Sequence, residues 1–233
     1  MKRILLALTI LALASASFGM SFVQIATNAA CTNATTCVAT FSSPTGAGHL
    51  IVCYQLGFGA NNRTVVSCTG AGTSALCPTS ECHVFGATNY NIDAAYVLSS
   101  TSGNTAITVT INSANPSWAI AVLEYAPSGT VTYDKGGASV NASCTTSCVG
   151  QALTLTGTND TIVQAAVGGP NVTAISGCYT NPNGIFSGIG MNGCVNTSSG
   201  TAPTWTLSAG GGIALGAIAF KDAGGGKLPI VFQ

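Results

Sequence analysis

The sequence predicts an all-β protein, an antiparallel sandwich or barrel that is stapled by disulfides. Short apolar runs, several of them alternating with polar residues, are separated by turns rich in glycine, serine, asparagine and proline. No stretch combines a helical period, a cap and enough length for a helix. The ten cysteines are an even number, as a disulfide framework requires. A parallel β-solenoid is the rival architecture, but it needs a fixed short period, which we do not find.

Residues 117–125, SWAIAVLEY, form the densest apolar run after the N-terminus. Side chains alternate along a strand, so Trp118 and Glu124 face one side while Ala119 and Tyr125 face the other. Both faces are mainly apolar, which predicts a strand that is covered on both sides.

The N-terminus has the layout of a secretory signal peptide. Lys2 and Arg3 precede an apolar run at residues 4–14, which is too short to span a membrane, and Ala14-Ser15-Ala16 fits a cleavage site. We expect a signal segment at residues 1–20 with cleavage near 16–20, one sandwich domain at 21–222, and a tail at 223–233.

The first part of the expected domain holds eight strands. Residues 21–27 and 105–111 alternate, 49–56 and 117–125 are rich in β-branched and aromatic residues, and Pro44 ends the strand at 36–42. The runs at 49–56 and 63–68 suggest a hairpin that places Cys53 opposite Cys68. The other expected strands are 83–85 and 92–98.

The second part is expected to hold six shorter strands. A turn at Pro127-Ser128-Gly129 leads into the first of them, and the glycine-rich stretch between Cys178 and Cys194 is expected to be a long loop. The strands are 130–134, 152–155, 161–167, 172–175, 204–207 and 213–220.

The cysteines are expected to pair with their neighbours in sequence, since such pairs close small loops. The expected bridges are Cys31–Cys37, Cys53–Cys68, Cys77–Cys82, Cys144–Cys148 and Cys178–Cys194. A zinc site at Cys77, Cys82 and His83 is the rival interpretation, although the C-x-x-C spacing of zinc sites is absent.

Charge is sparse. Without Lys2 and Arg3, four basic and six acidic residues remain, a net charge of 4 − 6 = −2. This excludes a basic surface for nucleic acid and a polybasic membrane anchor. We expect a surface of hydroxyl and amide groups.

Several segments resemble one known family. In order, they are FSSPTGAGHLIVCYQL, AAYVLSSTSGNTAITVTI, AIAVLEYAPSG, GTNDTIVQAAVGG and APTWTLSAGGGIALGAIAFK. From about Thr36 to Lys221 the chain resembles secreted bacterial β-sandwich domains of uncharacterised function. The resemblance implies a jelly-roll-like sandwich and a location outside the cell, and it implies no catalytic residues. The cysteines depart from the family pattern.

The sequence offers residues for two catalytic arrangements. Glu124 and Asp134 suit the carboxylate pair of a glycosidase, and His49 or His83 is the only base for a serine triad. The alternative for Glu124 is a structural role, paired with Lys221 or Arg63, because a carboxylate in an apolar strand must be paired or neutral. The nucleophile motif G-x-S-x-G is absent.

Candidate binding residues lie in the expected loops and at strand ends. Tyr90 and Tyr179 are the candidate platform on which a sugar ring stacks. Asp93, Asp134 and Asp160 are candidate calcium ligands, although no run of acidic residues supports such a site. No other cofactor is expected.

The C-terminal tail joins a glycine linker at 223–226 to an apolar segment, KLPIVFQ. That segment either folds back as an edge strand or adds to the sheet edge of another copy. Its candidate contact residues are Leu228, Ile230, Val231 and Phe232.

Together these features predict a non-enzymatic protein, secreted or held at the cell surface. We expect a structural or adhesion protein, a subunit of a filament or surface assembly built from identical copies by strand addition. The alternative is a carbohydrate-binding module with a polysaccharide partner. Neither nucleic acid nor, after signal removal, a membrane span is expected.

Overall fold

The computed structural model describes residues 19–59, 62–86, 89–179 and 184–223. Most of the expected signal segment and the apolar tail at 227–233 lie outside the described residues. Within them the chain is almost entirely antiparallel β-structure, which confirms the predicted fold class.

The described residues of the first half form nine strands and one short helix. They are β1 (Ser21–Cys31), β2 (Ala34–Thr40), β3 (Leu50–Phe58), β4 (Val65–Thr69), β5 (Ala75–Leu76), α1 (Thr79–Cys82), β6 (Val84–Phe85), β7 (Tyr90–Val97), β8 (Ala106–Asn115) and β9 (Ser117–Ala126).

The second half contains eight strands. They are β10 (Val131–Cys144), β11 (Ser147–Val149), β12 (Asp160–Gly168), β13 (Val172–Ile175), β14 (Gly184–Phe186), β15 (Ile189–Thr197), β16 (Thr204–Leu207) and β17 (Gly211–Asp222).

The strands form four sheets, which we name A to D. Sheet A has the order β1-β9-β3-β7-β5, with β6 also pairing β7, and sheet B has the order β2-β8-β4. Sheet C has the order β10-β17-β12-β15-β14, and sheet D has the order β11-β16-β13.

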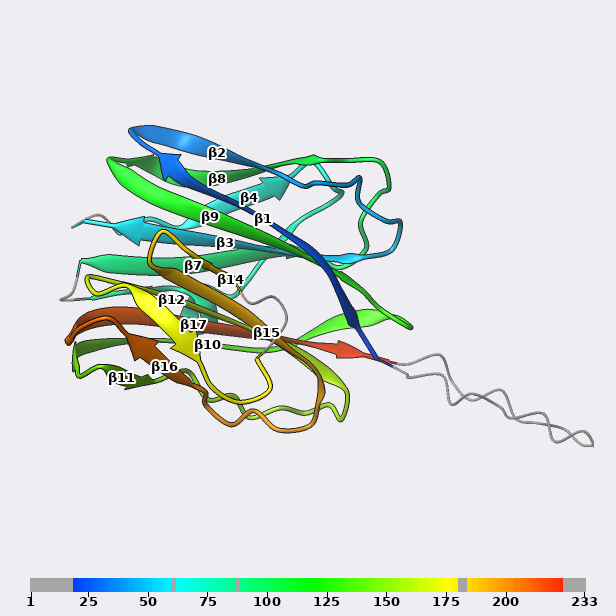
Figure 1. Cartoon of the computed structure of the whole chain (residues 1–233). Coiled ribbons are helices and arrows are strands. Elements are labelled where there is room, and N and C mark those ends of the chain that lie inside the picture. Colours follow the sequence, from blue (N-terminus) through cyan, green and yellow to red (C-terminus); the bar gives the residue numbers. More distant parts are fainter. Residues whose placement is uncertain (1–18, 60–61, 87–88, 180–183, 224–233) are drawn as a thin grey trace, which may run out of the picture.

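The four sheets stack in the order B, A, C, D (Figure 1). One apolar cluster lies between sheets B and A, a second between A and C, and two more between C and the sheet D side. Sheets A and C are therefore both interior layers, and the molecule is two sandwiches packed face to face.

Strand β9 lies in the middle of this stack, as its composition predicts. Trp118, on one face, belongs to the cluster shared with sheet B. Tyr125, on the opposite face, belongs to the cluster shared with sheet C. The A–C contact is close, since the Tyr54 hydroxyl donates to the Val163 carbonyl at 2.9 Å and a Cβ at Gly216 would stand 2.8 Å from Ile92.

The second half repeats the strand path of the first. The short strands β5, β6 and β14, which pair with β7 or β15, are left aside. In the first half β1-β9-β3-β7 form the inner sheet and β2-β8-β4 the outer sheet. In the second half β10-β17-β12-β15 form the inner sheet and β11-β16-β13 the outer sheet, in the same order along the chain. The register irregularities recur as well. One lies between Phe22 and Gln24 in β1 and between Tyr133 and Lys135 in β10. The nested order is compatible with a jelly-roll-like path, which stays an expectation.

Two local predictions were wrong. Strand β3 pairs with β7 and β9, whereas β4 pairs with β8, so no hairpin joins residues 49–56 to 63–68. The stretch from Cys178 to Cys194 contains β14 and β15, not only a loop. Strand β15 was missed because it contains glycine, which is not typical of a strand. Gly190 is needed there, since a Cβ at this position would lie 2.4 Å from the Trp205 ring.

Smaller differences concern strand lengths. Strand β10 runs to Cys144, beyond the expected 130–134, and residues 152–155 form no strand. The backbone of Leu153 instead donates to the carbonyl of Gly200.

All five predicted disulfides are present. Cys53–Cys68 joins sheets A and B, so it ties two layers together. Cys31–Cys37 and Cys144–Cys148 occupy matching places, each joining the first strand of its half to the second.

A disulfide stabilises a fold mainly by restricting the unfolded chain, and a short loop gives the smaller effect. The Cys144–Cys148 bridge can test this. Replacing both cysteines by alanine is expected to lower the free energy of unfolding by about 2 kcal/mol, since the closed loop is short. Urea denaturation of the double variant measures the change, with Thr145→Ala in the same exposed loop as the control. A loss below about 0.5 kcal/mol would contradict the prediction.

Candidate functional site

Glu124 is the centre of the first polar cluster. Its carboxylate accepts hydrogen bonds from Gln24 Nε2 at 2.6 Å and from the Gly46 amide at 2.8 Å, and it contacts His49 Nδ1 at 2.6 Å. Glu124 has no solvent exposure. The expectation that this carboxylate is paired is right, but its partners are not Lys221 or Arg63.

A second cluster joins Asp134 on β10, Asp160 at the start of β12 and Lys221 on β17. Asp134 accepts from the Thr156 hydroxyl at 2.5 Å and from the Thr156 amide at 2.8 Å, and Lys221 Nζ lies 3.0 Å away. Burial pushes the pKa of Asp134 upward, but these donors outweigh it and lower the pKa to about 2.

Asp160 responds in the opposite direction. It is fully buried, and burial together with the hydrogen bond and negative charge of Asp134 raises its pKa to about 7. The Gly157 amide, which donates to Asp160, and the positive charge of Lys221 act against this rise but do not outweigh it. As a carboxylic acid, it can donate its proton to Asp134, so the pair shares one proton at acidic and near-neutral pH.

The third cluster surrounds Asp93 on β7. Burial raises the pKa of Asp93 to about 6, although the amides of Val65 and Ala94 donate to its oxygens. The His83 ring lies 3.8 Å away, and burial lowers the pKa of this imidazole. His83 Nε2 contacts the Asn62 side chain at 2.7 Å.

These contacts do not link the residues of the two catalytic arrangements to each other. Glu124 and Asp134 lie in different sheets and share no hydrogen-bond partner. Each histidine contacts a carboxylate, but among the described residues no serine side chain hydrogen-bonds to either imidazole ring.

The candidate zinc and calcium ligands do not come together as a metal site in the described residues. Cys77 and Cys82 are bonded to each other, so they are not zinc ligands. Asp93, Asp134 and Asp160 are held in two separate networks, and the described residues contain no group of three or more side chains placed for a metal ion.

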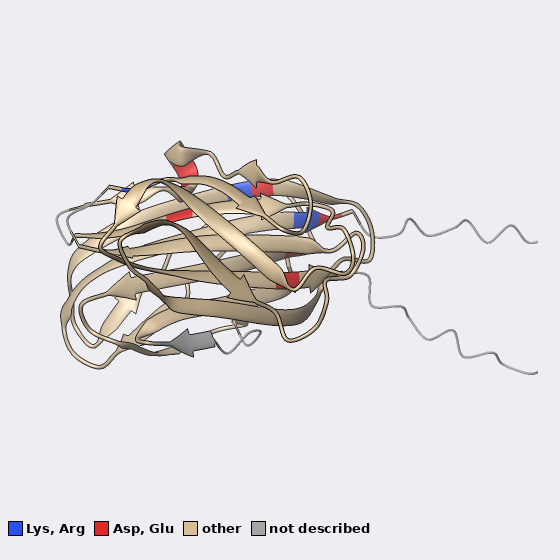
Figure 2. Cartoon of the chain, turned by 90° about the horizontal axis from the view of Figure 1, so that it is seen from above, with Lys and Arg blue, Asp and Glu red and all other residues tan. Residues whose placement is uncertain are grey.

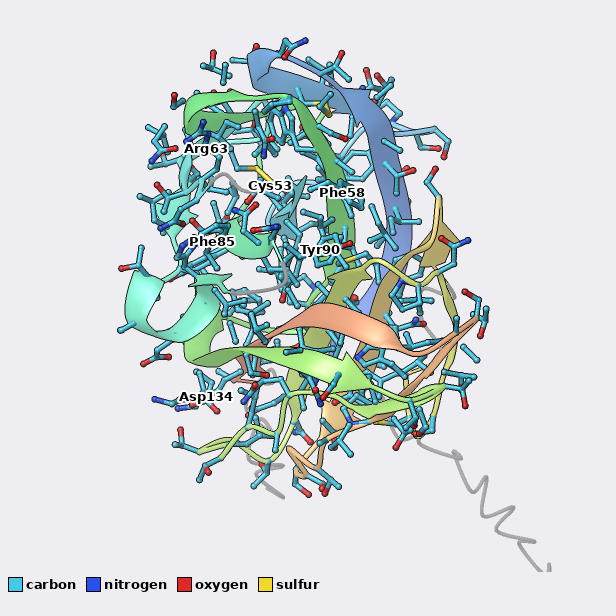
Figure 3. All side chains as sticks on the ribbon, turned by 90° about the vertical axis from the view of Figure 1, so that its left-hand side faces the viewer. Cys53, Phe58, Arg63, Phe85, Tyr90 and Asp134 are labelled. Atoms are coloured by element: carbon cyan, nitrogen blue, oxygen red, sulfur yellow. A yellow bond between two sulfur atoms is a disulfide. The ribbon has the colours of Figure 1, made fainter. Side chains whose placement is uncertain are left out.

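The two candidate tyrosines differ in exposure. Tyr90 is half-buried and packs edge-on against Phe58, with ring centroids 6.2 Å apart (Figure 3). Tyr179 is only 5% exposed, and its hydroxyl lies 3.3 Å from Gln164 Nε2. A buried ring offers no face to a sugar, so Tyr179 does not form the expected platform.

An open groove at the end of β7 was not anticipated from the sequence. Its larger part has a volume of about 470 Å³ and is lined by residues 72–75 with Leu98, Ser99 and Thr101. An adjoining hollow of about 260 Å³ shares Leu98 and Ser99 and reaches Gly48 and residues 129–131. We name the two together the Leu98 groove. Small uncharged residues line it, and these carry little signal in a sequence rich in Gly, Ser and Thr.

No helix in the described part of the chain has the length and hydropathy to cross a bilayer. No family model, curated protein or solved structure matches the chain.

Proposed function

We propose that the protein is a non-enzymatic extracellular structural or adhesion protein that assembles with identical copies through its C-terminal apolar segment. The observation that carries the proposal is that the charged side chains bond to groups of their own chain. Each carboxylate of the described residues is buried or bonded within its own chain, so the outer face offers hydroxyl and amide groups.

The charged side chains are few (Figure 2). Lys135 contacts Glu81 at 3.1 Å, and Lys221 contacts Asp134 at 3.0 Å. Asp222 is buried and accepts from the Ser128 amide at 2.7 Å. Charge of this kind stabilises the fold and supplies no field to steer a charged substrate.

Disulfides support an oxidising location. Five bridges in one chain are typical of proteins outside the cytosol, where thiols are not kept reduced. Together with the expected signal segment, they support secretion or display at the cell surface.

The tail provides the means of assembly. Residues 227–233 combine four apolar side chains with one lysine, and three glycines separate them from the sandwich. Such a segment suits addition to the edge of a sheet in another copy.

Deleting residues 224–233 is the test. We expect the secreted full-length chain to form multimers and the shortened chain to be a monomer with the same circular dichroism spectrum. Size-exclusion chromatography with light scattering measures the mass, and electron microscopy shows any filament.

Lys227→Ala is the matched control, because it leaves the apolar side chains of the tail intact and should assemble like the parent. A monomeric full-length chain, or multimers that survive the deletion, would overturn the proposal.

A further inference from the structure

The Leu98 groove has a counterpart in the second half of the molecule. A cavity of about 140 Å³ is lined by Ser176, Gly177, Cys178 and Tyr179 on one side and by the loop after β15 on the other. The Leu98 groove likewise lies between the segment after β4 and the loop after β7. Since β13 and β15 correspond to β4 and β7 in the repeated path, the two cavities are equivalent.

Residue-level matches support this equivalence. Gly70 and Gly177 follow the matching strands and both have left-handed backbone, with φ of 110° and 86°. The next residues are Ala71 and Cys178. Cys178 forms a disulfide with Cys194, which lies opposite Ile162 in sheet C. At the matching place in the first half, Val97 lies opposite Ile51 in sheet A. Val97 and Ala71 belong to the same apolar cluster, and they occupy the places that Cys194 and Cys178 occupy in the second half.

The two cavities differ in what fills them. The position after this pair is Tyr179 in the second half and Gly72 in the first. The Tyr179 ring is buried against Leu153 and Ile162, so it closes its own site. Gly72 has no side chain, and the corresponding cavity in the first half is the larger of the two.

The groove also lies at an open sheet edge. Strand β5 is the last strand of sheet A, Ala75 of this strand lines the groove, and Leu76 is 50% exposed. No charged side chain lines either part of the groove. An extended apolar segment therefore meets both an unpaired edge and an uncharged hollow.

The described chain ends beside this groove. The Ala223 amide donates to the Thr130 carbonyl at 3.0 Å, and Thr130 lines the adjoining hollow. Phe232 follows Ala223 by nine residues, a reach of roughly 30 Å when the chain is extended. The tail carries only one aromatic side chain, Phe232, which is its largest apolar group.

We propose that the Leu98 groove is the acceptor site for residues 227–233 of a neighbouring copy, with Phe232 in the space opposite Gly72. This inference rests on the proposed assembly through the tail. Because each tail leaves its chain beside that chain's own groove, two copies can exchange tails reciprocally, and the contact closes as a two-fold pair.

Site-specific photo-cross-linking tests the acceptor. Phe232 is replaced by p-benzoylphenylalanine in the full-length chain, and light and ¹⁵N-labelled chains are mixed before irradiation. Mass spectrometry is expected to find cross-links between a light and a heavy chain at residues 72–75 or 98–101. Ser99→Trp, which fills the groove from an exposed position, should abolish them, whereas Ser113→Trp on sheet B should not. Phe232→Ala should weaken association by about tenfold to hundredfold.

The outcomes separate the two proposals. Multimers whose cross-links map elsewhere overturn the groove as acceptor and leave assembly through the tail standing. Cross-links to the groove within one chain overturn exchange between copies. A monomer that yields no cross-link overturns both.

Discussion

Replacing Glu124 by alanine is expected to lower the free energy of unfolding by about 3 to 5 kcal/mol. The variant leaves the Gln24 amide, the Gly46 N–H and the His49 ring, all of them half-buried, without the acceptor that they share, and only Gln24 keeps another, the Ser43 carbonyl. Donors that folding shields from water lose hydration and receive nothing in return. Urea denaturation at constant pH measures the loss.

Lys135→Ala is the control for this experiment. Lys135 belongs to an exposed ion pair with Glu81, and such pairs contribute about 1 kcal/mol or less. Equal losses in the two variants would show that the Glu124 network contributes no more than a surface contact. A folded Glu124→Ala variant also tests the assignment of Glu124 as structural, because its multimers should match those of the parent at temperatures where it stays folded.

Long apolar strands were the most predictable part of the fold. Strand β9 has apolar residues on both faces, so its burial between two layers could be read from the sequence. The disulfides were predictable because each pair is close in the chain, and proximity in sequence limits the choice of partner.

The layering itself was not predictable. Strands β3 and β4 are neighbours in sequence but lie in different sheets, and only long-range pairing with β9 and β8 decides this. The repeat of the path was hidden because the matching strands keep burial and register rather than residue identity. Tyr125 and Phe220, for example, fill matching positions opposite Phe22 and Tyr133.

The candidate site was less predictable than the fold. The sequence indicates that Glu124 must be paired, but it cannot show that Gln24 on β1 and His49, just before β3, reach it. The Leu98 groove brings together residues 72–75, Leu98 and Thr101, which are separated in the sequence and carry no motif.

Replacing Asp160 by asparagine is expected to stabilise the protein at pH 8 by about 2 to 4 kcal/mol and to have little effect at pH 4. The folded pKa of Asp160 is about 7, above the usual value of 3.8, so folding favours the protonated form. Its contribution is fully present below pH 4 and is lost as pH rises through 7, at about 1.4 kcal/mol for each unit of pKa difference. Asparagine keeps a donor for Asp134 and an acceptor for the Gly157 amide, and it cannot ionise.

Asp134→Asn is the matched control, with the opposite sign. The folded pKa of Asp134 is about 2, so its contribution is present above pH 3.8 and is lost as pH falls toward 2. Its replacement removes the acceptor of Thr156 and the partner of Lys221, and should destabilise the protein at pH 8. Unfolding free energies at pH 4, 6 and 8 measure both variants. An Asp160→Asn gain that is the same at pH 4 and pH 8 would show that Asp160 does not titrate as the buried acid of this pair.

Asp93, with a folded pKa of about 6, adds a pH dependence of stability with the same sign as that of Asp160, so the parent should be most stable near pH 4 to 5.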